Sequence, residues 1–362
     1  MMTNRISDLR SLLSSCGVKN PFLVTTRKSF DDYFVELLPS AINFTRFSDY
    51  SNNPKYEEAL LGVDLLRKSK CDGVIAMGGG SAIDMAKIIN LLSNNIDIDQ
   101  SSLFDKRKYK KSLPFFAIPT TAGSGSEATQ FAVIYIDGIK HSIDDELLRP
   151  SHYILDPLVL EKIPQRIIAH SGLDALCQSI ESHWSVKANA ESQYFSRLAI
   201  SLIWENLMDA FSGKPDAKAK MLSAAHYAGK AINITRTTAP HAISYPFTSI
   251  YGVEHGHAVS LSLLYFMQVN LHAENHQYNM TKEVVLRSIN EVFEATRSIG
   301  FLDFKTKFLE LTKSLGVQIN LTQFNLDEEK KMAIISQVNL DRLKNNPVQI
   351  SKEHLMCFLN GE

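Results

Sequence analysis

The chain has 362 residues, of which 44% are hydrophobic and 21% are charged, and its formal net charge at pH 7 is −1. This length exceeds the roughly 250–300 residues at which a single core stops growing, so two domains are expected. The near-neutral charge argues against a nucleic-acid partner, and no apolar run reaches the ~20 residues that would span a membrane.

The first half of the chain alternates between helix and strand patterns. Apolar residues recur at helical spacing in residues 6–15, 56–68 and 82–92. Short apolar runs typical of strands occupy residues 21–26, 73–77, 114–118, 131–135 and 152–155. Strands that alternate with amphipathic helices predict a parallel, doubly wound, Rossmann-like sheet with right-handed crossovers.

Strand patterns fade after Pro164, where helical spacing takes over. The expected helices cover residues 167–185, 190–211, 217–234, 259–269, 282–299, 303–314 and 351–358. Two prolines, Pro157 and Pro164, bracket the change of pattern. We therefore expect an α/β domain over residues 1–160 and an all-α domain over residues 161–362.

Two loops of the first half have the residues of a phosphate-binding site. Gly78–Ser81 (GGGS) lies between a strand and a helix, where glycines permit close approach and a helix N-terminus attracts anions. The usual GxGxxG fingerprint is absent, so a purely structural turn is an equal alternative. Residues 119–127 (PTTAGSGSE) crowd hydroxyls and glycines at the end of another strand, where ligands bind in open parallel sheets.

The stretch 237–259 contains three of the 11 histidines: His241, His255 and His257. Imidazole is the commonest protein metal ligand, and a histidine pair separated by a loop of this size can share an ion with a carboxylate from elsewhere. Asp174 is the candidate carboxylate, and Gln178 follows it on the same face of a helix. The alternative is that these histidines are ordinary buried or capping residues.

Together these motifs resemble one known family. GGGSAIDMAK (78–87), IPTTAGSGSEAT (118–129), GLDAL (172–176) and the His241/His255 pair are similar to the group III metal-dependent, "iron-containing" alcohol dehydrogenases. That fold is shared with glycerol dehydrogenase and dehydroquinate synthase. The resemblance implies an N-terminal dinucleotide-binding domain and a helical C-terminal domain, with one divalent metal in the cleft between them and often a homodimer. It implies hydride transfer between NAD(P)H and a small aldehyde or alcohol.

The resemblance also assigns expected roles to particular residues. Asp174, His241 and His255 match metal ligands. Gln178 stands where a second histidine is usual, and it either coordinates the metal through its carbonyl oxygen or leaves that position to water, so the expected metal is zinc or iron. The expected cofactor-binding residues are Thr26, Gly79, Gly80, Ser81, Asp84, Thr120, Thr121, Ser124 and Lys140. Glu127 and Glu181 are expected to be structural and to pair with loop N–H groups or neighbouring helices.

Three residues near the expected metal have alternative interpretations. Tyr245 replaces a histidine that many family members carry, and either relays a proton or packs on the cleft wall. His257 either contacts substrate or metal, or lies in a helix N-terminal region. Arg236 is the candidate for binding an anionic substrate group, and its alternative role is a charge at a helix C-terminus.

The cofactor and substrate are less closely defined by the sequence. Thr26 stands where NAD-preferring relatives tend to have an acid, and Arg27 and Lys28 follow it, which favours NADP(H) over NAD(H) unless both bases are simply solvated. The pattern around Asp174 and His241 resembles the phosphonoacetaldehyde reductase branch. A lyase similar to dehydroquinate synthase and a non-catalytic relative are the alternative functions. The widely spaced cysteines and the lack of a signal peptide predict a cytoplasmic protein.

Overall fold

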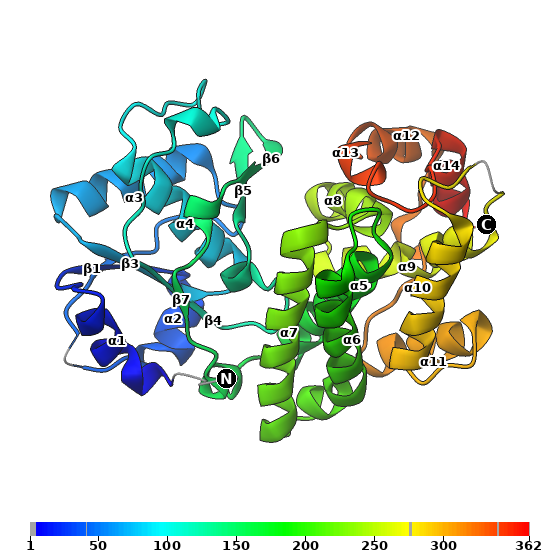
Figure 1. Cartoon of the computed structure of the whole chain (residues 1–362), viewed down its shortest axis with the longest axis horizontal. Coiled ribbons are helices and arrows are strands. Elements are labelled where there is room, and N and C mark those ends of the chain that lie inside the picture. Colours follow the sequence, from blue (N-terminus) through cyan, green and yellow to red (C-terminus); the bar gives the residue numbers. More distant parts are fainter. Residues whose placement is uncertain (1–4, 41, 275–276, 339, 362) are drawn as a thin grey trace. The chain divides into compact units, whose positions relative to one another are not determined.

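A computed structural model describes residues 5–40, 42–274, 277–338 and 340–361. The chain folds as two compact units, Met1–Ile163 and Pro164–Glu362. Figure 1 colours the chain from blue at the N-terminus to red at the C-terminus and labels its elements. The units divide three residues beyond the boundary at residue 160 that the sequence suggests.

The first unit is built on a five-stranded parallel sheet with the order β2-β1-β3-β4-β7. The strands are β1 (Pro21–Thr25), β2 (Thr45–Phe47), β3 (Gly73–Gly78), β4 (Phe115–Pro119) and β7 (His152–Tyr153). The parallel α/β class expected from the sequence is therefore confirmed. The chain leaves β1 towards β2 on one side and returns as β3 on the other, so the strand order reverses between β1 and β3. In open parallel sheets, ligands bind at the carboxyl ends of strands beside such a switch point.

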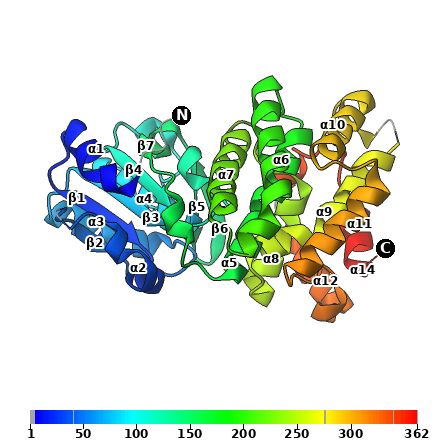
Figure 2. The same cartoon turned by 90° about the horizontal axis from the view of Figure 1, so that it is seen from below.

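Helices cover both faces of this sheet, which explains why its central strands are apolar along their whole length. Every residue of β1, β3 and β4 is buried. In Figures 1 and 2, α1 (Leu9–Ser15) and α3 (Tyr56–Lys68) lie on opposite sides of β1. The third helix at the sheet, α4 (Gly80–Asn94), is buried over most of its length. A strand covered on both faces has no polar alternation to reveal it, only a continuous apolar run.

One expected strand does not join the parallel sheet. Residues 131–135 lie in β5 (Phe131–Ile136), which pairs antiparallel with β6 (Ile139–Asp144) in a separate two-stranded sheet. Asp137 and Gly138 both have positive φ, at 50° and 77°, as the tight turn of a hairpin requires. The expectation that residues 131–135 extend the parallel sheet was wrong. The second strand, IKHSID, is mostly polar and has a single buried residue, so it lacks the apolar run by which the other strands were found.

The second unit is helical, as the sequence predicts. Its longer helices are α5 (Gln165–Trp184), α6 (Ala190–Phe211), α7 (Pro215–Thr235), α8 (Ala239–Tyr251), α9 (His255–His272), α10 (Lys282–Ala295) and α11 (Phe301–Ser314), and α12 (Glu328–Ser336), α13 (Leu340–Leu343) and α14 (Lys352–Asn360) follow. Helices α5, α6 and α7 pack side by side (Figure 1). Within the described part of the chain, none of the helices has the length and hydropathy needed to cross a bilayer.

The histidine-rich stretch is more helical than expected. His241 and His255 are separated by helix α8 rather than by a loop, and α9 begins at His255 rather than at residue 259. Pro240 lies in the first turn of α8, where its missing N–H is not needed, and Pro246 lies inside the helix. Gly252 ends α8 with a left-handed conformation, φ 66°. Two prolines in one short stretch are typical of a loop, so the sequence did not predict this helix.

Helix α9 begins in very close contact with α5. A Cβ atom added to Gly256 would lie 1.8 Å from the carbonyl oxygen of His170 and 2.9 Å from the backbone nitrogen of Asp174. Both neighbours are backbone atoms of α5, so no side chain could move aside. Only glycine permits this approach, and it brings the first turn of α9 directly against the turn of α5 that carries Asp174.

Candidate metal centre and cofactor loops

Three side chains from three helices of the second unit gather into one group of possible metal ligands. Asp174 comes from the middle of α5, His241 from the first turn of α8, and His255 from the first residue of α9. Their ligand atoms all lie within 4.8 Å of one another. Oδ1 of Asp174 is 3.3 Å from Nε2 of His241 and 3.7 Å from Nε2 of His255. The structure thus brings together the three residues that the sequence suggested as ligands.

The other nitrogen of His241 is held by Glu181, a fully buried carboxylate on α5. Nδ1 of His241 pairs with Oε2 of Glu181, so Nε2 faces Asp174. Oε1 of Glu181 accepts hydrogen bonds from the backbone N–H groups of Thr238, at 2.9 Å, and His241, at 3.1 Å. The expected pairing of Glu181 with loop N–H groups is present. Its hydrogen bond with His241, which fixes the tautomer and the ring orientation, was not predicted from the sequence.

The electrostatics of this group favour a bound cation. Burial alone would lower the pKa of His241, but the neighbouring Glu181 and Asp174 carboxylates outweigh burial and raise it to about 9. Asp174 and Glu181 thus place two buried carboxylates around one imidazole. One carboxylate and two imidazoles, one of them oriented by a second carboxylate, fit a catalytic divalent metal site with an open coordination position. Gln178 is buried one turn after Asp174 on α5.

Replacing Glu181 with glutamine should weaken metal binding about 10- to 100-fold, the usual effect of removing such a supporting carboxylate. An amide is the same size, but its NH2 group cannot accept the proton of Nδ1. The imidazole can then turn to the tautomer whose Nε2 is protonated and cannot bind a metal. Competition with a fluorescent chelator would measure the affinity.

The matched control for this variant is Glu291→Gln. Glu291 accepts from Nε2 of His183, at 2.9 Å, so it too is a carboxylate paired with a histidine of α5. This control should leave the metal affinity unchanged. Equal affinities for the Glu181→Gln variant and the parent protein would show that Glu181 does not support a metal ligand.

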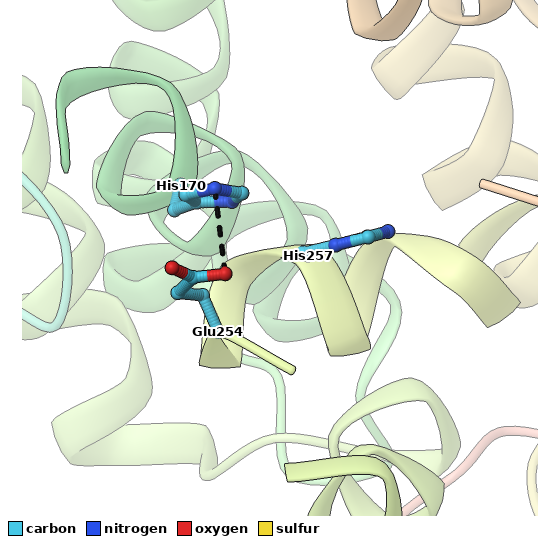
Figure 3. A group of neighbouring side chains, drawn as sticks. All are labelled: His170, Glu254 and His257. Carbon is cyan, nitrogen blue, oxygen red and sulfur yellow. Dashed lines mark ion pairs between the residues drawn. The ribbon is translucent and has the colours of Figure 1, made fainter. Parts of the chain in front are cut away.

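A second group of possible ligands lies one turn earlier on α5 and includes His257. Ligand atoms of His170, Glu254 and His257 also lie within 4.8 Å of one another. Figure 3 shows His170 in contact with Glu254, a 3.7 Å ion pair, with His257 to one side. Glu254 also pairs with Arg166, and Nε2 of His257 donates to the carbonyl of Gln318 at 2.5 Å. Because Arg166 already supplies positive charge to Glu254, this group has less need of a metal than the group around Asp174.

Tyr245 lies beside His255, one of the candidate ligands. Their rings are nearly parallel, 6° apart, with centroids separated by 6.1 Å. The guanidinium carbon of Arg342, on α13, lies 5.4 Å from the centre of the Tyr245 ring. Tyr245 is therefore positioned next to the metal group, whereas Arg342 reaches it from a segment that no sequence motif linked to the site.

Arg236 ends helix α7 in an unusual backbone conformation. Its φ of 65° and ψ of −178° belong to a region that is almost exclusive to glycine. The side chain is partly buried, and its Nη1 atom is fully so. Both interpretations of Arg236 offered by the sequence, a substrate contact and a charge at a helix terminus, agree with this position.

In the first unit, the two loops suspected of binding phosphate contact each other. A Cβ added to Gly79 would lie 3.3 Å from Oγ1 of Thr121, and one added to Gly80 would lie 2.8 Å from Oγ of Ser124. The N–H of Thr120 donates to the carbonyl of Gly78 at 3.0 Å. The hydroxyl-rich loop therefore packs closely against the glycine turn, and a side chain at Gly80 would displace Ser124. Ser81, in the first turn of that helix, is partly buried beside this contact.

Asp84 has a structural task in the same region. Its Oδ1 accepts from the hydroxyl of Ser126 at 2.5 Å, and its Oδ2 accepts from the N–H of Val133 at 2.9 Å. Both carboxylate oxygens thus join α4 to the loop and to β5. The geometry favours a supporting role for Asp84 over the direct cofactor contact expected from the sequence. Lys140 lies apart from the glycine turn, on β6 opposite Tyr135.

Lys87 completes this support from inside the protein. Its side chain is fully buried, and Nζ donates to the hydroxyls of Ser126, at 3.0 Å, and Thr129, at 2.9 Å, and to the carbonyl of Phe131, at 2.8 Å. A buried ammonium with three acceptors holds the end of the hydroxyl-rich loop against α4.

The segment after β1 is more balanced in charge than its sequence suggested. Thr26 precedes α2 (Arg27–Tyr33) as its N-cap, at the carboxyl edge of the sheet beside the glycine turn. Arg27 pairs with Asp49 at 3.1 Å, and both side chains are largely exposed. Arg46 donates to the carbonyls of Thr26 and Arg27, at 3.3 and 3.2 Å. An acidic and a second basic residue thus accompany Arg27, and neither was visible from the local sequence.

Comparison with known proteins agrees with the fold. Residues 1–157 match the family model described as iron-containing alcohol dehydrogenase, and residues 168–361 match the C-terminal model of the Fe-containing alcohol dehydrogenase family. The chain belongs to the iron-containing alcohol dehydrogenase family, a family of oxidoreductases that act on alcohols and aldehydes.

Similar proteins include enzymes with different substrates. The aldehyde-alcohol dehydrogenase 2 of Entamoeba histolytica is 29% identical over 81% of this chain and 36% of its own length. The phosphonoacetaldehyde reductase of Streptomyces viridochromogenes is 34% identical over 57% of this chain and 55% of its own length. The NADPH-dependent butanol dehydrogenase of Clostridium saccharobutylicum is 26% identical over 84% of this chain and 79% of its own length. The match thus covers less than two thirds of the first two relatives.

Solved structures resemble nearly the whole chain. The sulfoacetaldehyde reductase of Bifidobacterium kashiwanohense, solved with NAD+, is 29% identical, has a TM-score of 0.86, and matches 99% of this chain and 95% of its own. An iron-containing alcohol dehydrogenase of Thermotoga maritima is 26% identical with a TM-score of 0.83, and matches 98% of this chain and 94% of its own.

Proposed function

We propose that this protein reduces small aldehydes, or oxidises the corresponding alcohols, with NAD(P)H and a divalent metal held by Asp174, His241 and His255. The single observation that carries the proposal is this ligand group, in which Asp174 and His241 are buried and Glu181 fixes the second nitrogen of His241. The donor set suits zinc or ferrous iron, and Gln178 lies one turn from Asp174, where an oxygen ligand or a water could complete the site.

Different residues of the chain would bind the metal, bind the cofactor and supply the proton. When bound, the metal would polarise the carbonyl oxygen of the substrate, and the nicotinamide would supply the hydride. The contact between Gly79, Gly80 and the 119–127 loop supports binding of the cofactor phosphates at the start of α4. Tyr245, parallel to His255, is the proposed source of the proton for the alkoxide, either directly or through a water.

Both NADP(H) and NAD(H) remain candidate cofactors. Arg27 and Lys28 favour a 2′-phosphate, whereas Asp49 beside Arg27 opposes one. Among similar proteins, the butanol dehydrogenase is NADPH-dependent and the sulfoacetaldehyde reductase was solved with NAD+. Rates of NADH and NADPH oxidation, compared at equal concentration, would decide the preference.

The deciding experiment is metal analysis combined with a screen of small aldehydes, with and without a chelator. A reductase should contain close to one metal per chain and oxidise NADPH or NADH, and the chelator should abolish this oxidation. Loss of phosphate from a phosphorylated substrate without net cofactor turnover would identify a lyase. A protein that holds no metal and consumes no cofactor would be a non-catalytic relative.

We further propose a cytoplasmic homodimer. The dimer is supported by the family resemblance, and the location by widely spaced cysteines that form no CxxC motif. Size-exclusion chromatography with light scattering would give the mass of the assembly, and a monomer would contradict the proposal.

A further inference from the structure

Arg342 reaches the metal group through an aromatic ring. Its guanidinium carbon lies 5.4 Å from the centre of the Tyr245 ring, and that centre lies 6.1 Å from the centre of the His255 ring. The guanidinium is therefore no farther from His255 than the sum of these two distances. A permanent positive charge lies this close to a proposed metal ligand although nothing in the aldehyde reaction itself requires it.

The position of Arg342 is fixed by the segment that follows α7. Nη1 of Arg342 donates to the hydroxyl of Thr237. Three residues later, the buried Asn345 donates to the carbonyls of Thr235, at 2.7 Å, and Thr237, at 3.0 Å. The next residue of the segment, Thr238, donates to Glu181. Residues 235–238 thus contact both Glu181, which orients His241, and the guanidinium of Arg342. The fold therefore sets the distance between Arg342 and the metal group.

The same segment carries Arg236 in its glycine-like conformation. A non-glycine residue there has a conformational cost, and such costs persist mainly at functional sites. Glycine would remove the cost, yet the chain has an arginine whose Nη1 is buried. Two arginines are thus attached to one segment beside the metal group.

From these contacts we propose that Arg342, assisted by Arg236, binds a tetrahedral oxyanion on the substrate, so that the preferred aldehyde carries a phosphonate or sulfonate group. This proposal rests on the proposed reductase function and names the substrate class of the same site. A guanidinium forms two parallel hydrogen bonds with such an anion and keeps its charge at any physiological pH.

The kinetic test compares phosphonoacetaldehyde and sulfoacetaldehyde with uncharged propionaldehyde, in the parent protein and in Arg342→Leu. The variant should raise KM for the preferred anionic aldehyde roughly 10- to 150-fold, the factor that corresponds to lost hydrogen bonds to a charged group. Its kcat/KM for propionaldehyde should change less than threefold. Arg342→Lys keeps the charge but loses the planar guanidinium. Its KM for the anionic aldehyde should therefore lie between the values for the parent protein and for Arg342→Leu.

A binding test separates this proposal from the reductase function because it needs no turnover. Ethylphosphonate and ethanesulfonate would be titrated calorimetrically into metal-free protein. At least one should bind the parent protein and not Arg342→Leu, and the preferred anion distinguishes a phosphonate from a sulfonate substrate. Arg287→Leu, which removes an exposed arginine of α10, is the control and should bind as the parent does.

The outcomes separate the two proposals. Turnover of propionaldehyde as good as that of both anionic aldehydes would overturn the anion site and leave the reductase standing. An equal loss of kcat for charged and uncharged aldehydes in Arg342→Leu would show that Arg342 merely supports Tyr245. Anion binding that depends on Arg342, in a protein that reduces no aldehyde, would retain the site and reject the reductase.

Discussion

Replacing Asp174 with asparagine should empty the metal site and reduce aldehyde turnover by about a thousandfold or more. A metal that polarises a carbonyl contributes several kcal/mol to the rate, and each 1.36 kcal/mol corresponds to about tenfold. Asparagine has the same shape but lacks the charge that lies 3.3 Å from Nε2 of His241 and 3.7 Å from Nε2 of His255. Metal content by atomic emission and single-turnover rates would measure the two effects.

The matched control is His170→Gln, which alters the second group of possible ligands on the same helix. We expect this variant to retain its metal, because the negative charge of Glu254 is already balanced by Arg166. Circular dichroism would establish that both variants are folded. The opposite result, in which the His170→Gln protein loses metal and the Asp174→Asn protein keeps it, would move the metal centre to the group in Figure 3.

Replacing Gly256 with alanine should damage both the metal site and the stability of the helical unit. The new Cβ would lie 1.8 Å from the carbonyl oxygen of His170, and a backbone atom cannot rotate away. Helix α9 must then shift away from α5, at a cost of about 1–3 kcal/mol or more for an overpacked contact. Because His255 begins α9 and Asp174 lies on α5, the shift would separate two ligands. The unfolding temperature and the metal affinity should both fall.

Gly213→Ala separates these two effects. Gly213 has a φ of +96° with open space around it, so alanine there strains the backbone by roughly 1–2 kcal/mol without touching α5 or α9. This control should lower the unfolding temperature but keep the metal affinity. If the Gly256→Ala protein had the same unfolding temperature and metal affinity as the parent protein, α5 and α9 could not approach each other as closely as described.

Much of the first unit could be predicted because its strands are buried on both faces. A short apolar run such as GVIAM, followed directly by glycines, favours a strand covered on both faces, and those glycines mark the turn into α4. The hairpin was misplaced because β6 carries a mostly polar pattern with a single buried residue. The three-residue strand β2 was missed because it is too short to show any periodicity.

The metal group was predictable in part. Asp174 and the histidines were found by residue type, and the spacing from Asp174 to Glu181 put both carboxylates on one helix face. Which carboxylate would hold the metal and which would orient His241 depends on where α8 packs, and local sequence carries no such information. Arg342 was missed for the same reason, since its contact with Tyr245 joins segments that only the tertiary fold brings together.

The burial of Lys87 has a consequence for how the first unit responds to ionic strength. Its ammonium is occupied by two hydroxyls and a carbonyl inside the protein, so it is not available to neutralise a phosphate at the glycine turn. Attraction of a phosphate at this turn can come from backbone N–H groups and the dipole of α4, which act at contact distance. Binding of a pyrophosphate at this turn should therefore depend less on added salt than binding at a loop that uses a lysine.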